Sequence, residues 1–398
     1  MPDILLKNVR PLGGPASDVA VSGGRIVIAH EEPASPPPTI VEGGGAILLP
    51  GLIDSHMHLD KSMIGLPWYR NETGPRLADR IEAGRAAKRR LGMDVERQTR
   101  RQALRCLALG TTAIRTHVDV DDVVKLRSAE AVLAAREALR GLVDIEVVAF
   151  PQSGMLVRPG VPELMEEALK LGVDIVGGID PSAIERDPRG HIDFVFGLAE
   201  RHGVPLDIHL HEPAELGAFA MELIIDRTRT LGMQGKVTIS HAFCLGMLAA
   251  PQLEPLLADL AEARISVVTT GIPSYPTAPL KRMVEAGIAV CAGSDGTRDT
   301  FGPYGDGDML ERAKFISMRN TFYRDADLEL ALDICTNGGA RVLGLADYGL
   351  QPGSKADFVL VEAETVAEAV VSHPRRRTVF KGGRMVARDG ELLVGPGA

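Results

Sequence analysis

Eight short apolar runs, each followed by a longer stretch whose apolar residues recur at helical spacing, constrain this chain more than any other feature. The runs are rich in β-branched residues, and their alternation with helices is typical of repeated βα units around a parallel sheet. We therefore predict an α/β fold, a (β/α)8 TIM barrel, over residues 50–345. The runs span residues 51–59, 111–120, 144–150, 174–180, 205–211, 236–242, 265–270 and 289–295.

The two ends of the chain have a different pattern, with short β-prone pieces separated by glycine and proline turns. Residues 4–47 fit small antiparallel strands, and residues 377–394 hold two apolar runs on either side of Gly382 and Gly383, which predicts a hairpin. We predict one small β-sandwich domain formed by both termini, with its parts at 1–49 and 346–398. A length of 398 residues suits one barrel with such a satellite.

Charge and cysteine content exclude several classes of protein. The formal net charge is -9, and the densest basic run, Arg375 to Arg377, is too short to follow a phosphate backbone. We expect no nucleic-acid partner. The sequence has no apolar run of transmembrane length and no signal-peptide pattern, so we expect a cytoplasmic protein without a membrane partner. The four cysteines lack C-x-x-C spacing, which argues against a thiolate zinc site.

Polar side chains gather at the ends of the predicted strands, where TIM barrels carry their catalytic groups. Six of the ten histidines lie there. His56 and His58 are two residues apart, so on a strand they share one face and can hold one metal ion. A single histidine in such a place is more often a hydrogen-bonded core residue. A same-face pair joined by His209 and Asp295 at other strand ends favours a metal site.

Three neutral imidazoles and one carboxylate form a donor set for Zn²⁺ or Fe²⁺ and leave a position for water. A metal-bound water ionises near neutral pH, so this donor set predicts hydrolysis. The run at 174–180 contains no lysine, which argues against a carbamylated lysine between two metals. We therefore predict one divalent metal ion, bound by His56, His58, His209 and Asp295.

Three further residues near strand ends are candidates for proton transfer and substrate binding. Glu212 follows His209 by three residues and is either a proton shuttle or a solvated loop carboxylate. His241 is either the group that orients or deprotonates the water or a core histidine. Gln152 has an amide that can contact the edge of a heterocycle, or it makes an ordinary loop hydrogen bond.

The remaining polar residues near the strand ends are predicted to support the site. Lys61 and Asp60 form either a buried pair beside the site or a pair on the surface. His117 and Asp119 are candidates for groups behind the metal ligands. His211 is expected to point away from the face that His209 shares with the metal, and we do not include it among the metal ligands.

In these residues the chain resembles the amidohydrolase superfamily, specifically the branch of bacterial cytosine deaminase and N-isopropylammelide isopropylaminohydrolase. The resemblance covers nearly the whole chain. It rests on the ordered segments HMHLDKS, RTHVDV, VVAFPQSG, VGGIDPS, DIHLHE, ISHA, GSDGTRDTFGPYGDGDM, GARVLGL and DYGLQPGSKADFVLV. It implies the barrel with a small β-sandwich from both termini, a mononuclear metal site and a homo-oligomer. The matching metal ligands are His56, His58, His209 and Asp295.

The resemblance also implies roles for other residues. Glu212 matches the proton shuttle at the ring nitrogen, His241 the water-activating histidine, and Gln152 the residue that reads the substrate amide. Together with Asp295, which relays a proton to the leaving amine, Glu212 and His241 are the expected catalytic residues. Gln152, Lys61 and Phe301 are the expected substrate contacts.

Two departures from the family pattern bear on the substrate. Cytosine deaminases have a second Asp directly after the metal Asp and a Trp shortly beyond, where this chain has Gly296 and Phe301. The pocket that would face cytosine is therefore altered. Lys61 and the segment RDxxxPxGxGDM look more like the aminotriazine enzyme, although that enzyme has Asp where this chain has Glu212.

From these patterns we expect a hydrolase that acts on carbon–nitrogen bonds other than peptide bonds, in cyclic amidines. The leading prediction is metal-dependent hydrolytic deamination of a small amino-substituted N-heterocycle, with a cytosine-like pyrimidine first. One alternative is an N-alkylaminotriazine aminohydrolase with a roomier pocket beside Gly296. Two others are a cyclic amidohydrolase, which usually relies on two metals, and a catalytically inactive barrel used as a scaffold.

Overall fold

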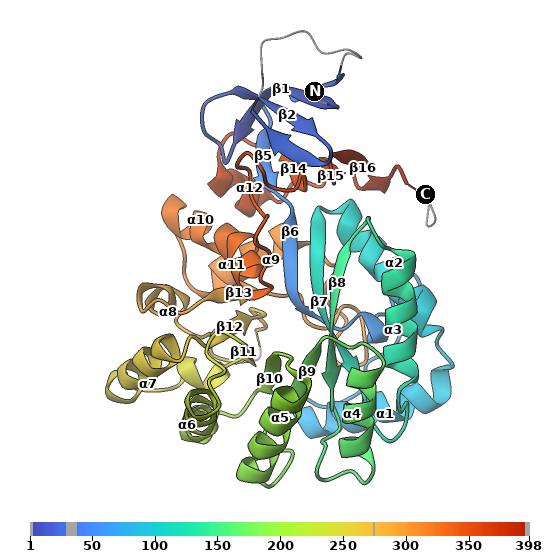
Figure 1. Cartoon of the computed structure of the whole chain (residues 1–398), viewed down its shortest axis with the longest axis vertical. Coiled ribbons are helices and arrows are strands. Elements are labelled where there is room, and N and C mark those ends of the chain that lie inside the picture. The colour runs from blue at the N-terminus through green and yellow to red at the C-terminus, as the bar shows by residue number, and fades with distance from the viewer. Residues whose placement is uncertain (1–2, 29–37, 274, 395–398) are drawn as a thin grey trace.

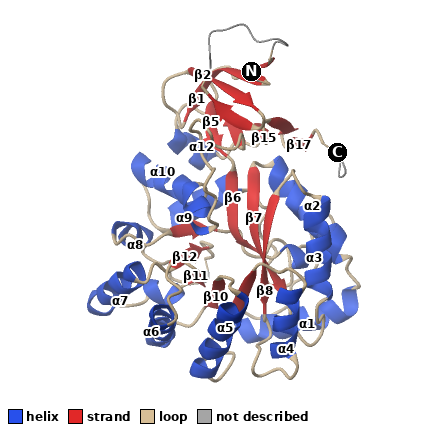
Figure 2. Cartoon of the chain, viewed as in Figure 1, coloured by secondary structure: helices blue, strands red, loops and turns tan. Residues whose placement is uncertain are grey.

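The chain forms a large barrel with a smaller β-sheet region stacked on one end (Figure 1). The structure is a computed structural model that describes residues 3–28, 38–273 and 275–394. Helices surround the barrel strands, whereas the smaller region is mainly sheet (Figure 2). The N- and C-terminal segments both lie in the smaller region, so this region joins residues from opposite ends of the sequence.

The barrel sheet has eight parallel strands among the described residues, and they neighbour one another in sequence order. Each of the eight predicted runs contains one of them. The strand side chains are buried almost throughout, as expected for a parallel sheet with both faces covered. The strands are β6 (Leu52–Met57), β7 (Thr111–Asp119), β8 (Asp144–Phe150), β9 (Ile175–Ile179), β10 (Leu206–Leu210), β11 (Val237–His241), β12 (Ser266–Thr269) and β13 (Val290–Ala292).

The barrel closes where its last strand, β13, meets its first strand, β6. The backbone N–H of Asp295 donates to the carbonyl of His56 at 2.8 Å. Asp54 Oδ1 accepts from the N–H groups of both His56 (3.3 Å) and Ser294 (3.0 Å). Gly293 lies in this seam, where a Cβ atom would come within 2.3 Å of the His56 carbonyl oxygen. The seam thus brings two predicted metal ligands together from opposite ends of the barrel sequence.

Helices form the outer layer of the barrel (Figure 2). Three of them begin at Asp94, Asp187 and Asp308, whose side chains accept N–H groups of the first turn and so satisfy donors that a helix leaves unpaired. The helices are α1 (Leu77–Leu91), α2 (Val95–Ala108), α3 (Arg127–Ala138), α4 (Val161–Lys170), α5 (Pro188–His202), α6 (Ala214–Thr230), α7 (Ala250–Glu262), α8 (Leu280–Glu285), α9 (Met309–Arg319), α10 (Asp325–Ile334) and α11 (Asn337–Val342), with 3-10 turns η1 (Leu59–Lys61) and η2 (Phe243–Gly246).

The smaller region is a nine-stranded sheet with its own apolar core, and the described residues before β6 and after α11 build it together. The predicted hairpin at Gly382 and Gly383 is present: both glycines have positive φ, and Lys381 pairs with Arg384 across the turn. The elements are β1 (Ile4–Pro11), β2 (Ser17–Ser22), β3 (Arg25–Val27), β4 (Thr39–Glu42), β5 (Ile47–Pro50), β14 (Phe358–Val361), α12 (Val366–Ser372), β15 (Arg377–Lys381), β16 (Arg384–Arg388) and β17 (Glu391–Leu392).

The expectation of antiparallel strands at the N-terminus is only partly right. The pairing of β1 with β2 and of β2 with β3 is antiparallel, but β1 runs parallel to both β4 and β5. The reason is that two direction changes, from β1 to β2 and from β2 to β3, precede the strands that pair next with β1. These later strands, β4 and β5, run in the same direction as β1. Strand spacing along the sequence does not reveal such a return.

Buried ion pairs join the smaller region to the barrel. Arg377, fully buried on β15, makes a two-pronged contact with Asp308 at the start of α9. Lys381 lies between Asp144 of β8 (2.8 Å) and Asp357 (2.6 Å). The division into parts at 1–49, 50–345 and 346–398 stays a prediction about folding units. Among the described residues, the helices are too short or too polar to cross a membrane.

Candidate active site

The predicted site residues come together at the carboxyl ends of the barrel strands. His56 is on β6, His209 on β10 and His241 on β11, while Asp295 follows β13. One donor atom from each of His56, His58 and His209 lies within 4.8 Å of the others, and the same holds for His56, His241 and Asp295. We refer to these five residues as the histidine cluster. Their side chains come from four different strand ends, which only the closed barrel brings together.

Outer partners fix the ring orientation of two of the predicted ligands. The hydroxyl of Ser240 donates to Asp207 Oδ1 (2.6 Å), so it accepts from the Nδ1–H of His56 (2.9 Å). His58 Nδ1 lies 3.0 Å from the carbonyl oxygen of His117, which can only accept, so this nitrogen also carries the proton. Both rings therefore turn an unprotonated Nε2 toward the cluster, as metal-binding imidazoles do.

Several nitrogens of the cluster have no hydrogen-bond partner in the described part of the chain. These are both ring nitrogens of His209 and the Nε2 atoms of His56 and His241. The Nε2 atoms of His58 and His56 lie 3.4 Å and 3.8 Å from Asp295 Oδ1. Buried polar atoms are rarely left unpaired unless an unseen ion or water satisfies them. The arrangement therefore fits a divalent cation, and it is a candidate metal site.

The protonation states of the cluster suit metal binding. Burial lowers the pKa of His56 and of His209 well below the ordinary value and lowers that of His58 to about 4. Burial by itself raises the pKa of Asp295, but the nearby imidazoles of His58, His241 and His56 lower it well below its usual range. At neutral pH the candidate site therefore offers neutral imidazoles and one carboxylate, the donor types that Zn²⁺ and Fe²⁺ prefer.

Backbone strain coincides with the strand ends of the site. His241 has a φ of 74°, Asp295 of 62° and Asp180 of 30°, in a region that residues with side chains rarely adopt. Such strain is common where a fold holds functional groups in a required position. The strained backbone at His241 and Asp295 therefore adds to the case for a functional site.

His211 lies closer to the site than predicted. Its ring stacks on that of His241, with centroids 4.4 Å apart, and its Nδ1 lies 2.8 Å from Asp180 Oδ2. The expectation that it points away from His209 was wrong: the two ring centroids lie 5.7 Å apart, and positions two residues apart share one face of a strand. Burial by itself lowers the pKa of His211, but Asp180 outweighs burial and raises it.

Glu212 is buried but does not contact the other predicted catalytic residues through any described hydrogen bond. Its Oε1 accepts from the backbone N–H groups of Ser182 (2.6 Å) and Ala183 (2.7 Å). Its Oε2 has no hydrogen-bond partner among the described residues. Burial raises the pKa of this carboxyl group and so favours its protonated form, which can donate a proton. The solvated-loop interpretation is therefore wrong, and one carboxyl oxygen remains free for another partner.

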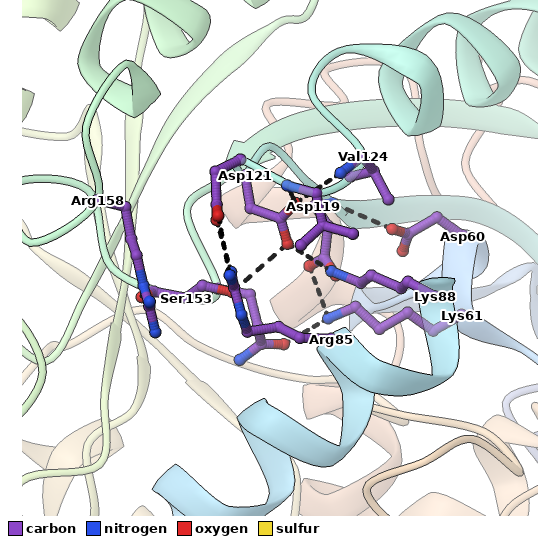
Figure 3. A network of polar contacts seen from close by, with 12 residues as sticks. Asp60, Lys61, Arg85, Lys88, Asp119, Asp121, Val124, Ser153 and Arg158 are labelled. Atoms are coloured by element: carbon purple, nitrogen blue, oxygen red, sulfur yellow. Dashed lines mark hydrogen bonds and ion pairs between the residues drawn. The ribbon is translucent and has the colours of Figure 1, made fainter. Parts of the chain in front are cut away.

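Lys61 is buried and belongs to a network of charged residues beside the cluster (Figure 3). Its Nζ lies 2.8 Å from Asp119 Oδ1 and donates to Gln152 Oε1. Lys88 of α1 contacts the other oxygen of Asp119 and lies 2.7 Å from Asp121. Asp60 accepts the backbone N–H of Asp119 (3.0 Å). We call these residues the Lys61 network. Lys61 is buried, as one of the two predicted arrangements requires. Its ion-pair partner, however, is Asp119 and not Asp60.

Opposing charges set the protonation of this network. Burial by itself raises the pKa of Asp119, but Lys61 and Lys88 outweigh burial and lower it to about 2. Burial and the charge of Asp119 raise the pKa of Asp60 to about 7. Asp119 is thus a firm anion between two lysines, which holds Lys61 Nζ against Gln152 and 3.3 Å from His58 Nδ1.

Phe301 lies beside Lys61 and Gln152, the other two residues predicted to contact the substrate. Its ring centroid is 5.4 Å from Lys61 Nζ, and these three residues line a cavity of about 230 Å³ under α1. The predicted metal ligands do not line this cavity. Lys61 therefore stands between the cavity and His58, which it contacts on the other side.

The space beside Gly296 is filled, contrary to the expected roomier pocket. A Cβ atom at Gly296 would lie 2.2 Å from Asp299 Oδ2. Asp299 is held there because its Oδ1 accepts from the N–H groups of Phe301 (2.7 Å) and Gly302 (3.1 Å). The absence of a side chain at Gly296 thus serves the packing of the loop that carries Phe301.

Sequence reasoning missed Asp54, Ser240 and Asp207, which fix the ligands from behind. A signal for two of them exists, because Asp54 and Asp207 each precede a predicted ligand by two residues and so share its face of the strand. His117 behaves as predicted, since its Nε2 lies 3.3 Å from Asp207 Oδ1 and its carbonyl holds His58. His56, His117 and Asp207 also bring donor atoms within 4.8 Å of one another, deeper in the barrel.

A barrel with a candidate metal site at its strand ends is the architecture of a hydrolase of the amidohydrolase type, and comparison agrees. The family model described as "Amidohydrolase family" matches residues 40–387, and the chain belongs to this family. N-isopropylammelide isopropyl amidohydrolase of Pseudomonas sp. is 33% identical over 382 residues, which are 95% of this chain and 94% of that protein.

Solved structures give the same assignment with greater detail. The crystal structure of N-isopropylammelide isopropylaminohydrolase from Burkholderia multivorans is 50% identical, has a TM-score of 0.95, and the match covers 99% of this chain and all of that one. 5-Methylcytosine deaminase from Klebsiella pneumoniae, liganded with 5-fluorocytosine, is 25% identical with a TM-score of 0.83 over 99% and 100% of the two chains. The predicted family and fold are confirmed.

Proposed function

We propose that the chain is a metal-dependent aminohydrolase that removes an amine from a ring carbon of a small N-heterocycle. The observation that carries this proposal is the set of buried, unpaired imidazole nitrogens around Asp295. One divalent ion, Zn²⁺ or Fe²⁺, would be held by His56, His58, His209 and Asp295. When bound, the ion supplies Lewis-acid activation of a water molecule.

The chain's own residues would then move the protons. His241, whose pKa burial lowers to about 3, is neutral and can accept a proton from the attacking water through its free Nε2. Glu212, whose pKa is raised, can donate a proton to the ring nitrogen beside the attacked carbon. Asp295 can then pass this proton from His241 to the departing amine, and the second proton of the water returns to Glu212. The carbon–oxygen bond forms, the carbon–nitrogen bond breaks, and the products are an oxo-substituted ring and an amine.

Two rings are candidates. An N-alkylaminotriazine is supported by the 50% identity to the Burkholderia enzyme and by Lys61 and the RDxxxPxGxGDM segment. A cytosine-like pyrimidine, the first choice of the sequence analysis, is supported by the deaminase from Klebsiella at lower identity. We place the aminotriazine first. A roomier pocket beside Gly296 is not an argument for the aminotriazine, because Asp299 fills that space.

The test is amine release from matched rings by chelated and remetallated protein. We expect the protein to release amine from amino- and alkylamino-substituted triazines. This activity should be lost when the metal is removed and regained when Zn²⁺ or Fe²⁺ is added. Equal activity without metal would contradict the mechanism. About two metal ions per chain with hydrolysis of cyclic amides would favour the cyclic amidohydrolase, and bound metal without any turnover would favour the inactive scaffold. The cytoplasmic location and the homo-oligomeric state stay predictions.

A further inference from the structure

One arginine from an outer helix joins the ends of two barrel strands at the candidate site. Arg312 lies in α9, and its side chain donates from Nη1 to the carbonyl of Thr270 and from Nη2 to the carbonyl of Ser294, the latter at 2.9 Å. Thr270 follows β12 and Ser294 follows β13. Both residues are buried, and a buried carbonyl needs a donor. A guanidinium group can serve both carbonyls at once because its N–H groups form a rigid fork.

The contact with Ser294 fixes the backbone of a predicted metal ligand. The carbonyl of Ser294 and the N–H of Asp295 belong to one peptide group. The N–H donates to the carbonyl of His56 at 2.8 Å, while the carbonyl accepts from Arg312. A planar peptide group that is held at both ends cannot rotate freely, so these contacts restrict the φ of Asp295, which is 62°. Arg312 therefore helps to hold the strained backbone that carries the carboxylate of Asp295.

The contact with Thr270 leads to His241. Thr270 Oγ1 lies 3.4 Å from His241 Nδ1. The proposed role of His241 requires an unprotonated Nε2, so the proton of the neutral ring is on Nδ1, where the hydroxyl of Thr270 can accept it. Because Arg312 holds the carbonyl of Thr270, it also restricts where this hydroxyl lies. One side chain thus holds the backbone next to both His241 and Asp295, which pass the water's proton to the amine in the proposed mechanism.

Helix α9 is itself fixed at the turn that carries Arg312. Asp308 accepts the N–H groups of Leu310 (2.9 Å) and Glu311 (3.4 Å) at the start of the helix. Its two oxygens also accept from Arg377 of the smaller region, each at 2.8 Å. Among the described residues, Arg312 donates to backbone carbonyls and to no carboxylate. An ion pair would stabilise a helix at least as well, so the use of two strand-end carbonyls points to a role in the site.

We propose that Arg312 is a positioning residue, which holds the ends of β12 and β13 so that His241 and Asp295 keep the relative position that metal binding and proton transfer require. The inference rests on the proposed function for the roles of these two residues. In the described part of the chain, Arg312 does not contact the three residues expected to bind the substrate. Its loss should therefore weaken metal binding and lower kcat, with little change in KM.

Arg312→Met tests the proposal, because it removes the fork and keeps an unbranched side chain. The dissociation constant for Zn²⁺, measured on the full chain by competition with a chromogenic chelator, should rise by about 10- to 100-fold, as is typical when an outer partner of a ligand is lost. At saturating Zn²⁺, kcat for amine release should fall while KM changes little. A purely structural role would lower the unfolding free energy but leave the Zn²⁺ constant and kcat of the folded chain unchanged.

Arg319→Met is the matched control. Arg319 also lies in α9 and also donates to a backbone carbonyl, that of Tyr275, which is outside the barrel strands. Zn²⁺ affinity and kcat should therefore be retained in this variant.

Two milder variants separate the parts of the proposal. Arg312→Lys keeps the charge but lacks the fork, so Zn²⁺ binding should weaken by about 5-fold, the value of one lost hydrogen bond. Thr270→Val removes the hydroxyl beside His241 and leaves the carbonyl for Arg312. In this variant kcat should fall by about 5-fold while Zn²⁺ affinity stays at the native value.

Each outcome supports or overturns the inference. Native Zn²⁺ affinity and kcat in Arg312→Met would overturn it, and so would equal losses in Arg319→Met or native values in Arg312→Lys. Unchanged kcat in Thr270→Val would overturn the part that concerns His241. If Arg312→Met does not fold, Arg312→Lys decides alone. A native chain that binds Zn²⁺ but releases no amine from any ring would refute the proposed function, and the Zn²⁺ constants of the variants would still decide whether Arg312 positions Asp295.

Discussion

The histidine cluster and the Lys61 network lie side by side, since Lys61 Nζ is 3.3 Å from His58 Nδ1, yet they treat buried polarity in opposite ways. In the network each lysine faces an aspartate. In the cluster, both nitrogens of His209 and the Nε2 atoms of two other histidines have no hydrogen-bond partner in the described chain. The lysines of the network are held in ion pairs, whereas the cluster keeps donor atoms free.

The difference indicates that the Lys61 network supports the site, whereas the histidine cluster binds a ligand. A buried charge without a partner is costly, so a paired network can be held rigidly at little risk to the fold. A neutral imidazole buried without a partner costs less than an unpaired charge but is still unfavourable, and four strand ends would not converge on such atoms unless a ligand satisfied them. The comparison therefore predicts that loss of a cluster residue abolishes metal binding and turnover, whereas loss of Asp119 from the network mainly reduces stability.

The largest effect is expected from His58→Ala. This change removes a donor atom from the metal site, so metal content should fall well below one ion per chain. Turnover should fall by more than the roughly 10- to 100-fold that follows loss of an outer partner of a ligand. Metal analysis and amine release measure this. A variant that keeps stoichiometric metal would contradict the ligand role of His58.

Asp119→Asn should break the network without emptying the cluster. The change leaves two buried lysines without their shared anion, and breaking a buried pair typically costs about 3–5 kcal/mol of unfolding free energy. Denaturant unfolding measures this loss, and metal content at saturating metal should be retained. Asp226→Asn, at an exposed position on α6, is the control and should change stability little. Comparable stability of the two variants would show that the network carries no such role.

Glu212→Gln tests proton transfer apart from metal binding. The amide keeps an oxygen for the N–H groups of Ser182 and Ala183 but cannot donate a carboxyl proton. Metal should remain bound while turnover falls by roughly 10²-fold or more. Glu215→Gln, at an exposed position three residues later, should retain turnover. Normal turnover of Glu212→Gln would remove this residue from the mechanism.

The smallest effect concerns pH and Asp60. Its pKa rises from the ordinary 3.8 to about 7 in the folded chain, so its stabilising contribution is complete below 3.8 and is lost as pH rises through about 7. Asp60→Asn stays neutral at every pH and can still accept the N–H of Asp119. The variant's unfolding free energy, relative to the native chain, should therefore increase between pH 5 and 8 by roughly 2–3 kcal/mol. A difference that is flat across this range would show that Asp60 ionises without penalty.

Much of the fold follows from sequence pattern. Each predicted barrel strand contains an observed one, because apolar runs bounded by turns report strands that are buried on both faces. The hairpin at Gly382 and Gly383 was predicted because such turns need positive φ. The parallel pairing of β1 with β4 and β5 was missed, since pairing direction depends on where the chain returns.

The candidate site was predictable to the extent that it follows strand geometry. The spacing of His56 and His58 and the polar strand ends indicated which residues would meet. His211 was misplaced although it follows His209 by two residues, the same spacing that puts His56 and His58 on one face. The partner of Lys61 was missed because Asp119 reaches it from the next strand.

The sequence by itself determined which side chains lie at the carboxyl ends of the barrel strands, because periodicity and donor chemistry are local properties of the chain. Only the tertiary structure decided how they are matched: Ser240 orients His56, Lys61 orients Gln152, and Asp299 fills the space beside Gly296. These contacts join segments up to 184 residues apart. Their physical cause is the closure of the barrel. Closure decides which of the many acceptors in the sequence lies next to each buried donor.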